Sequence, residues 1–108
     1  MSKIKLTYKD KDYILEYTRT TARGIEERGF VASKVESSPN RMIPLLVYGA
    51  FKKNHPTLKE TKIDEIFSAQ NRKGDLIGKL AELYAETITS LLGDGEETEE
   101  KNANWEII

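Results

Sequence analysis

Few side chains in this sequence of 108 residues have the chemistry of a catalytic site. The single histidine, His55, stands before Pro56 at the expected end of a helix, where it could act as a general base or a metal ligand. Cysteine is absent, and no His/Asp/Glu pair has a recognisable ligand spacing. We interpret His55 as a surface residue at a helix end, and we predict no metal and no cofactor.

The carboxylates and glycines also lack a catalytic pattern. Acidic residues recur in pairs such as Glu26–Glu27, Asp64–Glu65 and Glu82/Glu86, which is typical of the charged face of an amphipathic helix. The glycines are too scattered for a phosphate-binding loop, and no G-x-S-x-G motif marks a nucleophilic serine. The sequence therefore predicts a protein that is not an enzyme.

The charge distribution divides the chain into two parts. The net charge is −1, but residues 1–93 carry 16 basic and 12 acidic side chains, whereas residues 94–108 carry one basic and six acidic. This asymmetry predicts one domain, 1–93, followed by an acidic linker and tail, 94–108. Lysines near the N-terminus could contact phosphates, so a small regulatory nucleic-acid-binding protein is the alternative function. The isoelectric point of about 5.9 argues against it, since values above roughly 9 are usual for such domains.

The first 18 residues alternate apolar and polar side chains, which predicts a β-hairpin. With Asp10 and Lys11 as the loop, Tyr8 would face Tyr13 and Leu6 would face Leu15. In the same register Lys5 would pair with Glu16 on the other face. The free edges of such a hairpin can accept an extended peptide.

Helical spacing and start signals predict the elements that cover the hairpin. Thr20 or Thr21 is the expected cap of a helix that ends at Arg28, before Gly29. Residues 31–35 form either a third short strand or an extended connector. Three further helices are expected. The first either starts at residue 39 and is kinked at Pro44, or begins at Pro44 after a separate turn at 39–43. The second is capped by Thr61, and the third covers 76–92 and is capped by Asp75. The fold class is α+β, with a hairpin, extended by a third short strand if residues 31–35 form one, packed against about four helices.

No secretion signal or membrane span is visible in the sequence. The N-terminus alternates from its first residues, and no apolar run approaches the roughly 20 residues needed to cross a bilayer. The absence of cysteine suits a reducing compartment. We therefore expect a cytoplasmic protein with no membrane partner.

The chain ends in large apolar side chains after its acidic linker. Trp105, Ile107 and Ile108 stand in the last four positions, and tryptophan is enriched at the centres of protein interfaces. The segment could dock on its own domain or insert into a neighbour. We predict Phe51, Trp105, Ile107 and Ile108 as residues that bind a protein partner.

Four motifs follow one another along nearly the whole chain. They are the hairpin with its Tyr17-Thr18-Arg19 end, Glu27-x-Gly29-Phe30, the segment 43–51 with Asn54-His55, and Leu83-Tyr84 followed by an acidic linker and Asn104-Trp105-Glu106. In this order they resemble a family of small phage- and prophage-encoded proteins of Gram-positive hosts, found among tail genes and related to tail assembly chaperones.

This resemblance implies a binding protein in the cytoplasm of the bacterial host. Tail chaperones are thought to coat the long tape-measure protein and to recruit tail-tube subunits, so both are expected partners, and a homo-oligomer is possible in this family. A long apolar protein would aggregate unless its surface were covered, which gives such binding a physical purpose.

Overall fold

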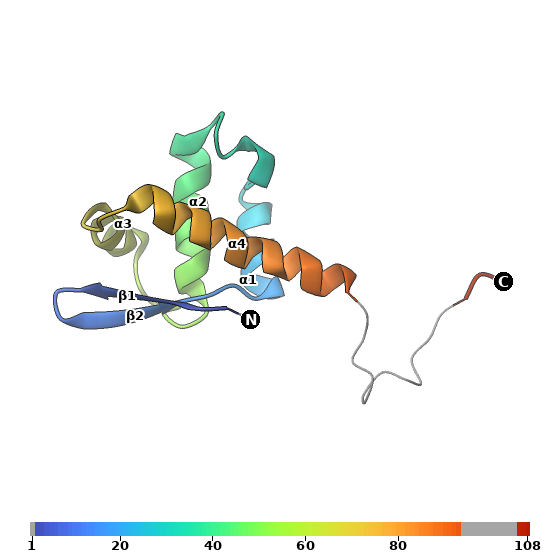
Figure 1. Ribbon diagram of the computed structural model, residues 1–108, viewed down its shortest axis with the longest axis horizontal. Coiled ribbons are helices and arrows are strands. Elements are labelled where there is room, and N and C mark those ends of the chain that lie inside the picture. The colour runs from blue at the N-terminus through green and yellow to red at the C-terminus, as the bar shows by residue number, and fades with distance from the viewer. Residues whose placement is uncertain (1, 94–105) are drawn as a thin grey trace.

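The computed structural model describes residues 2–93 and 106–108, and it has one hairpin and four helices there (Figure 1). This confirms the predicted α+β fold class. The linker at 94–105 lies outside the described residues. The elements are β1 (Ile4–Tyr8), β2 (Lys11–Leu15), α1 (Arg19–Glu27), a short 3₁₀ turn (Ala32–Lys34), α2 (Pro39–Lys52), α3 (Glu60–Ser68) and α4 (Lys73–Leu92).

The hairpin has its predicted faces but not its predicted register. Its loop is Lys9–Asp10, with φ of 50° and 63°, as a tight turn with two left-handed residues requires. Leu6 therefore lies opposite Tyr13, not Leu15, and Lys5 lies opposite Ile14, not Glu16. The register differs from the prediction by two residues, and such a shift leaves every side chain on the same face.

Helix α1 begins earlier than predicted. The cap is Thr18, not Thr20 or Thr21, and its side chain accepts a hydrogen bond from the Thr21 amide at 3.1 Å. The Thr21 hydroxyl in turn accepts from the Thr18 amide at 2.9 Å, so the two threonines cap each other's backbone. The helix ends at Glu27, one residue before the predicted Arg28, which is its C-cap, and Gly29 takes the predicted position after the cap with φ of 103°.

Other element bounds also differ from the predictions. Residues 31–35 form neither a strand nor an extended connector, since a 3₁₀ turn occupies most of them. Helix α3 begins before Thr61, which lies inside it, and α4 begins at Lys73, which places Asp75 in its first turn instead of at its cap. Their N-cap residues are Lys59 and Arg72, and neither makes a side-chain cap hydrogen bond, so cap-forming residue types do not mark these two helix starts.

Helix α2 is the centre of the fold. It is one continuous helix that contains Pro44, and it packs against α1, α3, α4 and β2 (Figure 1). Gly49 lets Tyr17 and Ile25 come close, since a Cβ there would lie 2.6 Å from the Tyr17 hydroxyl. The largest fully buried side chains come from four elements and the segment after β2, and they are Leu15, Tyr17, Leu46, Phe51, Ile66 and Leu80. Among the described helices, none is long and apolar enough to cross a membrane.

Candidate functional site

His55 follows the C-terminal end of α2 and contacts β2. Its Nε2 accepts a hydrogen bond from the Ile14 amide at 3.1 Å, which requires a neutral ring with its proton on Nδ1. The ring packs against Tyr13 and Phe51, with centroid distances of 5.1 and 6.1 Å. Partial burial, and then the charge of Lys11, lower the pKa of His55 below its usual value. His55 therefore holds the hairpin on α2, and it is half-buried rather than the free surface residue that the sequence suggested.

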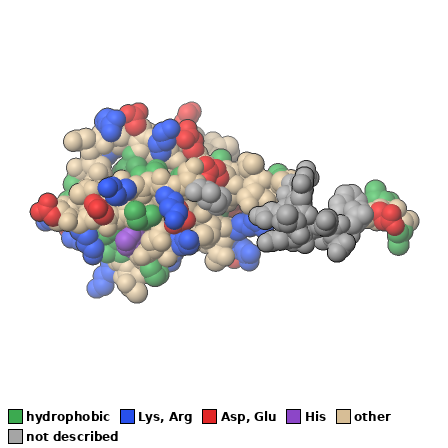
Figure 2. Space-filling model, turned by 60° about the horizontal axis from the view of Figure 1, so that its bottom comes forward, with side chains coloured by type: hydrophobic (Ala, Val, Ile, Leu, Met, Phe, Trp, Pro, Cys, Tyr) green, Lys and Arg blue, Asp and Glu red, His purple; other side chains and the backbone are tan. Residues whose placement is uncertain are grey.

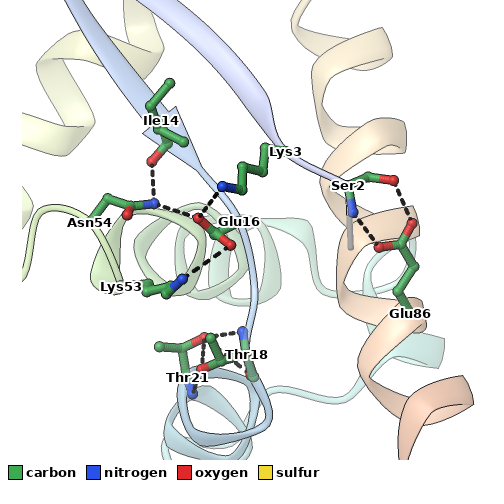
Figure 3. Close-up of polar contacts among 9 residues, drawn as sticks. All are labelled: Ser2, Lys3, Ile14, Glu16, Thr18, Thr21, Lys53, Asn54 and Glu86. Atoms are coloured by element: carbon green, nitrogen blue, oxygen red, sulfur yellow. Dashed lines mark hydrogen bonds and ion pairs between the residues drawn. The ribbon is translucent and has the colours of Figure 1, made fainter. Parts of the chain in front are cut away.

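A polar cluster around Glu16 also connects the hairpin to the end of α2 (Figure 3). The carboxylate of Glu16 is buried, and it accepts a hydrogen bond from Asn54 Nδ2 at 2.9 Å. Lys53 and Lys3 lie 3.4 and 3.9 Å away. The Asn54 bond, together with the two lysine charges, lowers the pKa of Glu16. This carboxylate is therefore ionised near neutral pH and held by its partners, which suits a structural role and not that of a general acid.

These contacts close the outer edge of β2 at Ile14 and Glu16. The Ile14 amide donates to His55, its carbonyl accepts from Asn54 Nδ2 at 3.2 Å, and the Glu16 amide donates to the Ala50 carbonyl at 3.0 Å. Both backbone groups of Ile14 thus point away from β1. In an antiparallel pair, the backbone N–H and C=O of the residue opposite must then also point away from the partner strand. The residue opposite Ile14 is Lys5.

The outer edge of β1 is open by comparison. In the described part of the chain the sheet has two strands, so nothing pairs with this edge as a third strand. Lys5 and Thr7 direct their backbone groups outward, and among residues 2–93 and 106–108 only Gln70 donates a bond to them, from its Nε2 to the Thr7 carbonyl at 3.3 Å. An open strand edge is the main structural feature that lets a protein accept an extended segment of another chain.

A groove of about 730 Å³ runs along this open edge. One wall is β1, and the other is the segment from Gln70 into the first half of α4. At Gly74 and Gly78 the second wall carries no side chain. An added Cβ at either position would point into open space, with no neighbour within 4 Å. Lys5, Lys79 and Glu82 place charges of both signs around the groove. It can therefore take an extended peptide without demanding one sign of charge.

A second hollow, of about 350 Å³, lies between α1, α2 and the start of α3, beside His55. Three of its ionisable side chains, Arg28, Glu60 and Tyr48, have bonds within the domain. Arg28 pairs with Glu60 at 2.7 Å, and the Tyr48 hydroxyl donates to Asp64 at 2.7 Å. Burial and the Asp64 bond raise the pKa of Tyr48 to about 12. Among the described residues, no group of three or more His, Cys, Asp or Glu could hold a metal ion.

Comparison with known proteins identifies the family of this chain. A family model described as a domain of unknown function, DUF5055, matches residues 1–108. The chain belongs to the DUF5055 family. No curated protein and no solved structure matches it.

Of the four predicted partner-binding residues, the structure of the DUF5055 chain describes Phe51, Ile107 and Ile108. Phe51 is wholly buried against Tyr13 and His55, so its prediction as a surface contact is wrong. Its position in the helical pattern is that of a core residue, not of an apolar helix surface open to a partner. Ile107 and Ile108 are exposed, and Trp105 lies outside the described residues.

The residues that shape the groove of the DUF5055 domain were not singled out from the sequence. Gln70, Gly74 and Gly78 look like a polar break and an ordinary helix start. One signal was present, since two glycines four residues apart weaken a helix by roughly 1 kcal/mol each and leave a flat surface. The contacts of Asn54 and His55 with β2 carry no sequence signal beyond the polar character of both side chains.

Proposed function

We propose that this domain is a non-catalytic protein-binding module that acts like a phage tail assembly chaperone. Its partner contributes an extended segment that adds to the outer edge of β1 and lies in the groove beside α4. The observation that carries the proposal is the open β1 edge along a groove of about 730 Å³, next to a β2 edge that the chain itself closes.

Strand addition suits a partner of great length. Backbone hydrogen bonds supply much of the affinity, so many different segments of one chain can bind in the same way. Several domains bound side by side would cover the apolar surface of a long protein, even if each bound weakly. A tape-measure protein has this need, and the resemblance of the sequence motifs to tail-gene proteins points to it and to tail-tube subunits as partners.

Several polar groups are hydrogen-bonded within the domain, which supports a role without catalysis. Glu16, Glu60 and His55 each have hydrogen-bond partners within the domain, and these contacts hold elements together. On the face seen in Figure 2, Lys and Arg are interspersed with Asp and Glu, so this face has no continuous positive surface suited to nucleic acid. We infer that binding of protein is the activity.

The test is co-purification with the protein encoded by a neighbouring long tail gene, using a variant that blocks only the strand edge. Lys5→Pro removes an amide that points outward, and proline is tolerated at a strand edge. Lys5→Thr is the matched control, because it removes the same charge and keeps the amide. We expect the wild-type chain and Lys5→Thr to bind and Lys5→Pro to bind at least about tenfold more weakly, which corresponds to about 1.4 kcal/mol.

Two results would contradict the proposal. If Lys5→Pro keeps its circular dichroism spectrum and binds as well as Lys5→Thr, the β1 edge is not the site. If no complex forms, and the domain instead binds DNA or RNA with an affinity that falls steeply as salt rises, the nucleic-acid alternative is correct.

A further inference from the structure

The side of α4 that is turned away from the core stays exposed in the described part of the chain. Six of its exposed positions recur at alternating spacings of four and three residues, which is the spacing of a coiled-coil seam. All six are apolar or glycine, and they are Gly74, Gly78, Ala81, Ala85, Ile88 and Leu92. We call these six residues the α4 seam. Such a pattern is typical of a helix that packs against a second helix.

Side-chain size changes in one direction along the α4 seam. Its start is formed by Gly74 and Gly78, around which a Cβ would meet nothing within 4 Å. Its end carries Ile88 and Leu92, which are 43% and 79% exposed. An unpartnered helix face with large side chains at one end and open space at the other is complementary to a copy of itself in the opposite direction.

We infer that the α4 seam binds a second copy of this chain as an antiparallel helix pair about a two-fold axis. In this pairing Leu92 of each copy lies over Gly74 of the other, and Ile88 lies over Gly78. Ala81 and Ala85 face each other near the axis, where two small side chains let the helices approach closely. Large residues meet glycines on both sides of the axis, as an isologous interface requires.

The residues that flank the α4 seam agree with the antiparallel arrangement. Leu91, 63% exposed, would meet the half-buried Ile77 of the second copy on one flank. On the other flank the two Glu82 side chains approach each other near the axis. Lys79 lies 3.5 Å from Glu82 in the same chain, so each copy brings a positive charge that offsets this repulsion.

The length of the α4 seam sets the expected affinity. Eighteen residues of rise span ~27 Å, and with a width of ~10 Å the contact covers about 300 Å² of each copy in projection. Stable interfaces bury about 800 Å² on each partner. The pair is therefore expected to be weak, so that it forms at high concentration and dissociates on dilution. Because Gly74 and Gly78 also line the groove, a bound segment and a second copy compete for this surface.

The first experiment measures self-association of the full chain by sedimentation equilibrium from about 1 μM to about 1 mM. We expect a reversible dimer for the wild-type chain. Gly78→Leu fills the space that Ile88 of the second copy needs, and it should leave only monomer. Gly24→Leu in α1 is the matched control, since a Cβ at Gly24 also has no neighbour within 4 Å. A wild-type monomer at every concentration, or equal dimer formation by Gly78→Leu and Gly24→Leu, would overturn the inference.

The second experiment tests the direction of the pair and uses the absence of cysteine from the sequence. Ala81→Cys and Ala85→Cys are exposed single-cysteine variants whose thiols face each other only in an antiparallel pair. Mild oxidation of their equimolar mixture should give a cross-linked dimer in several-fold greater yield than either variant alone. Greater cross-linking of one variant alone would indicate parallel helices and overturn the assignment. Both experiments use the isolated chain, so their outcome is independent of any tail protein.

Discussion

The hydrogen bond between His55 and β2 gives a prediction that can be worked through in energy and in pH. His55→Phe keeps an aromatic ring against Tyr13 and Phe51 but leaves the Ile14 amide without its acceptor. An unsatisfied buried donor costs about 1–3 kcal/mol, and the partial exposure of Ile14 places the expected loss near the lower end. For a domain of this size, a loss of about 1 kcal/mol lowers Tm by roughly 4–8 °C.

The pH dependence separates this bond from ring packing. The folded-state pKa of His55 lies below the unfolded value of 6.5, so the bond stabilises the fold fully above pH 6.5. As pH falls through the folded value, the ring is protonated and this contribution is lost. The difference in free energy of unfolding between the wild type and His55→Phe should therefore be largest near pH 8 and shrink towards pH 5. Urea denaturation at both pH values measures it, and a difference that stays constant with pH would refute this explanation.

Three further changes test other parts of the fold. Thr18→Ala removes the reciprocal cap of α1 and should cost about 1 kcal/mol in a thermal melt, whereas the exposed Thr20→Ala should cost much less. Gly49→Ala places a Cβ 2.6 Å from the Tyr17 hydroxyl and should destabilise the domain by roughly 1–3 kcal/mol despite the better helix propensity of alanine; unchanged stability would show that this packing is loose. Glu16→Gln removes the charge beside Lys53 and should lower stability at pH 7 by roughly 1 kcal/mol, with the difference from the wild type disappearing as pH falls below 4.5 through the folded pKa of Glu16.

Residue periodicity predicted the elements of this fold better than their ends. The alternation of Leu6, Tyr13 and Leu15 determines which face of the hairpin is buried, but it does not determine the turn. Registers that differ by two residues bury the same side chains, so the choice depended on the loop at Lys9–Asp10. The helix starts were ambiguous for a similar reason. Thr18 and Thr20 both have side chains suited to a cap, and the path of the chain after β2 selects the first.

The candidate site was less predictable than the fold. That a hairpin has free edges follows from its topology, but the sequence does not show which edge another part of the chain covers. The answer depends on where α2 ends relative to β2, since only that position brings Asn54 and His55 to Ile14. The buried position of Phe51 depends on the same packing. Long-range contacts of this kind are set by the whole core and not by a local pattern.

The closed edge of β2 limits how far the sheet can grow. A sheet with two open edges can join copies without end, which is the geometry of a fibre. If two of these domains met at their open edges, β1 would pair with β1, and both outer strands of the resulting sheet would be β2, whose Ile14 backbone groups are already bonded. A fifth strand would find the backbone groups of Ile14 already bonded, so edge-to-edge growth beyond four strands is disfavoured. Many domains can therefore be concentrated along one partner without starting a fibrous aggregate through their own sheets.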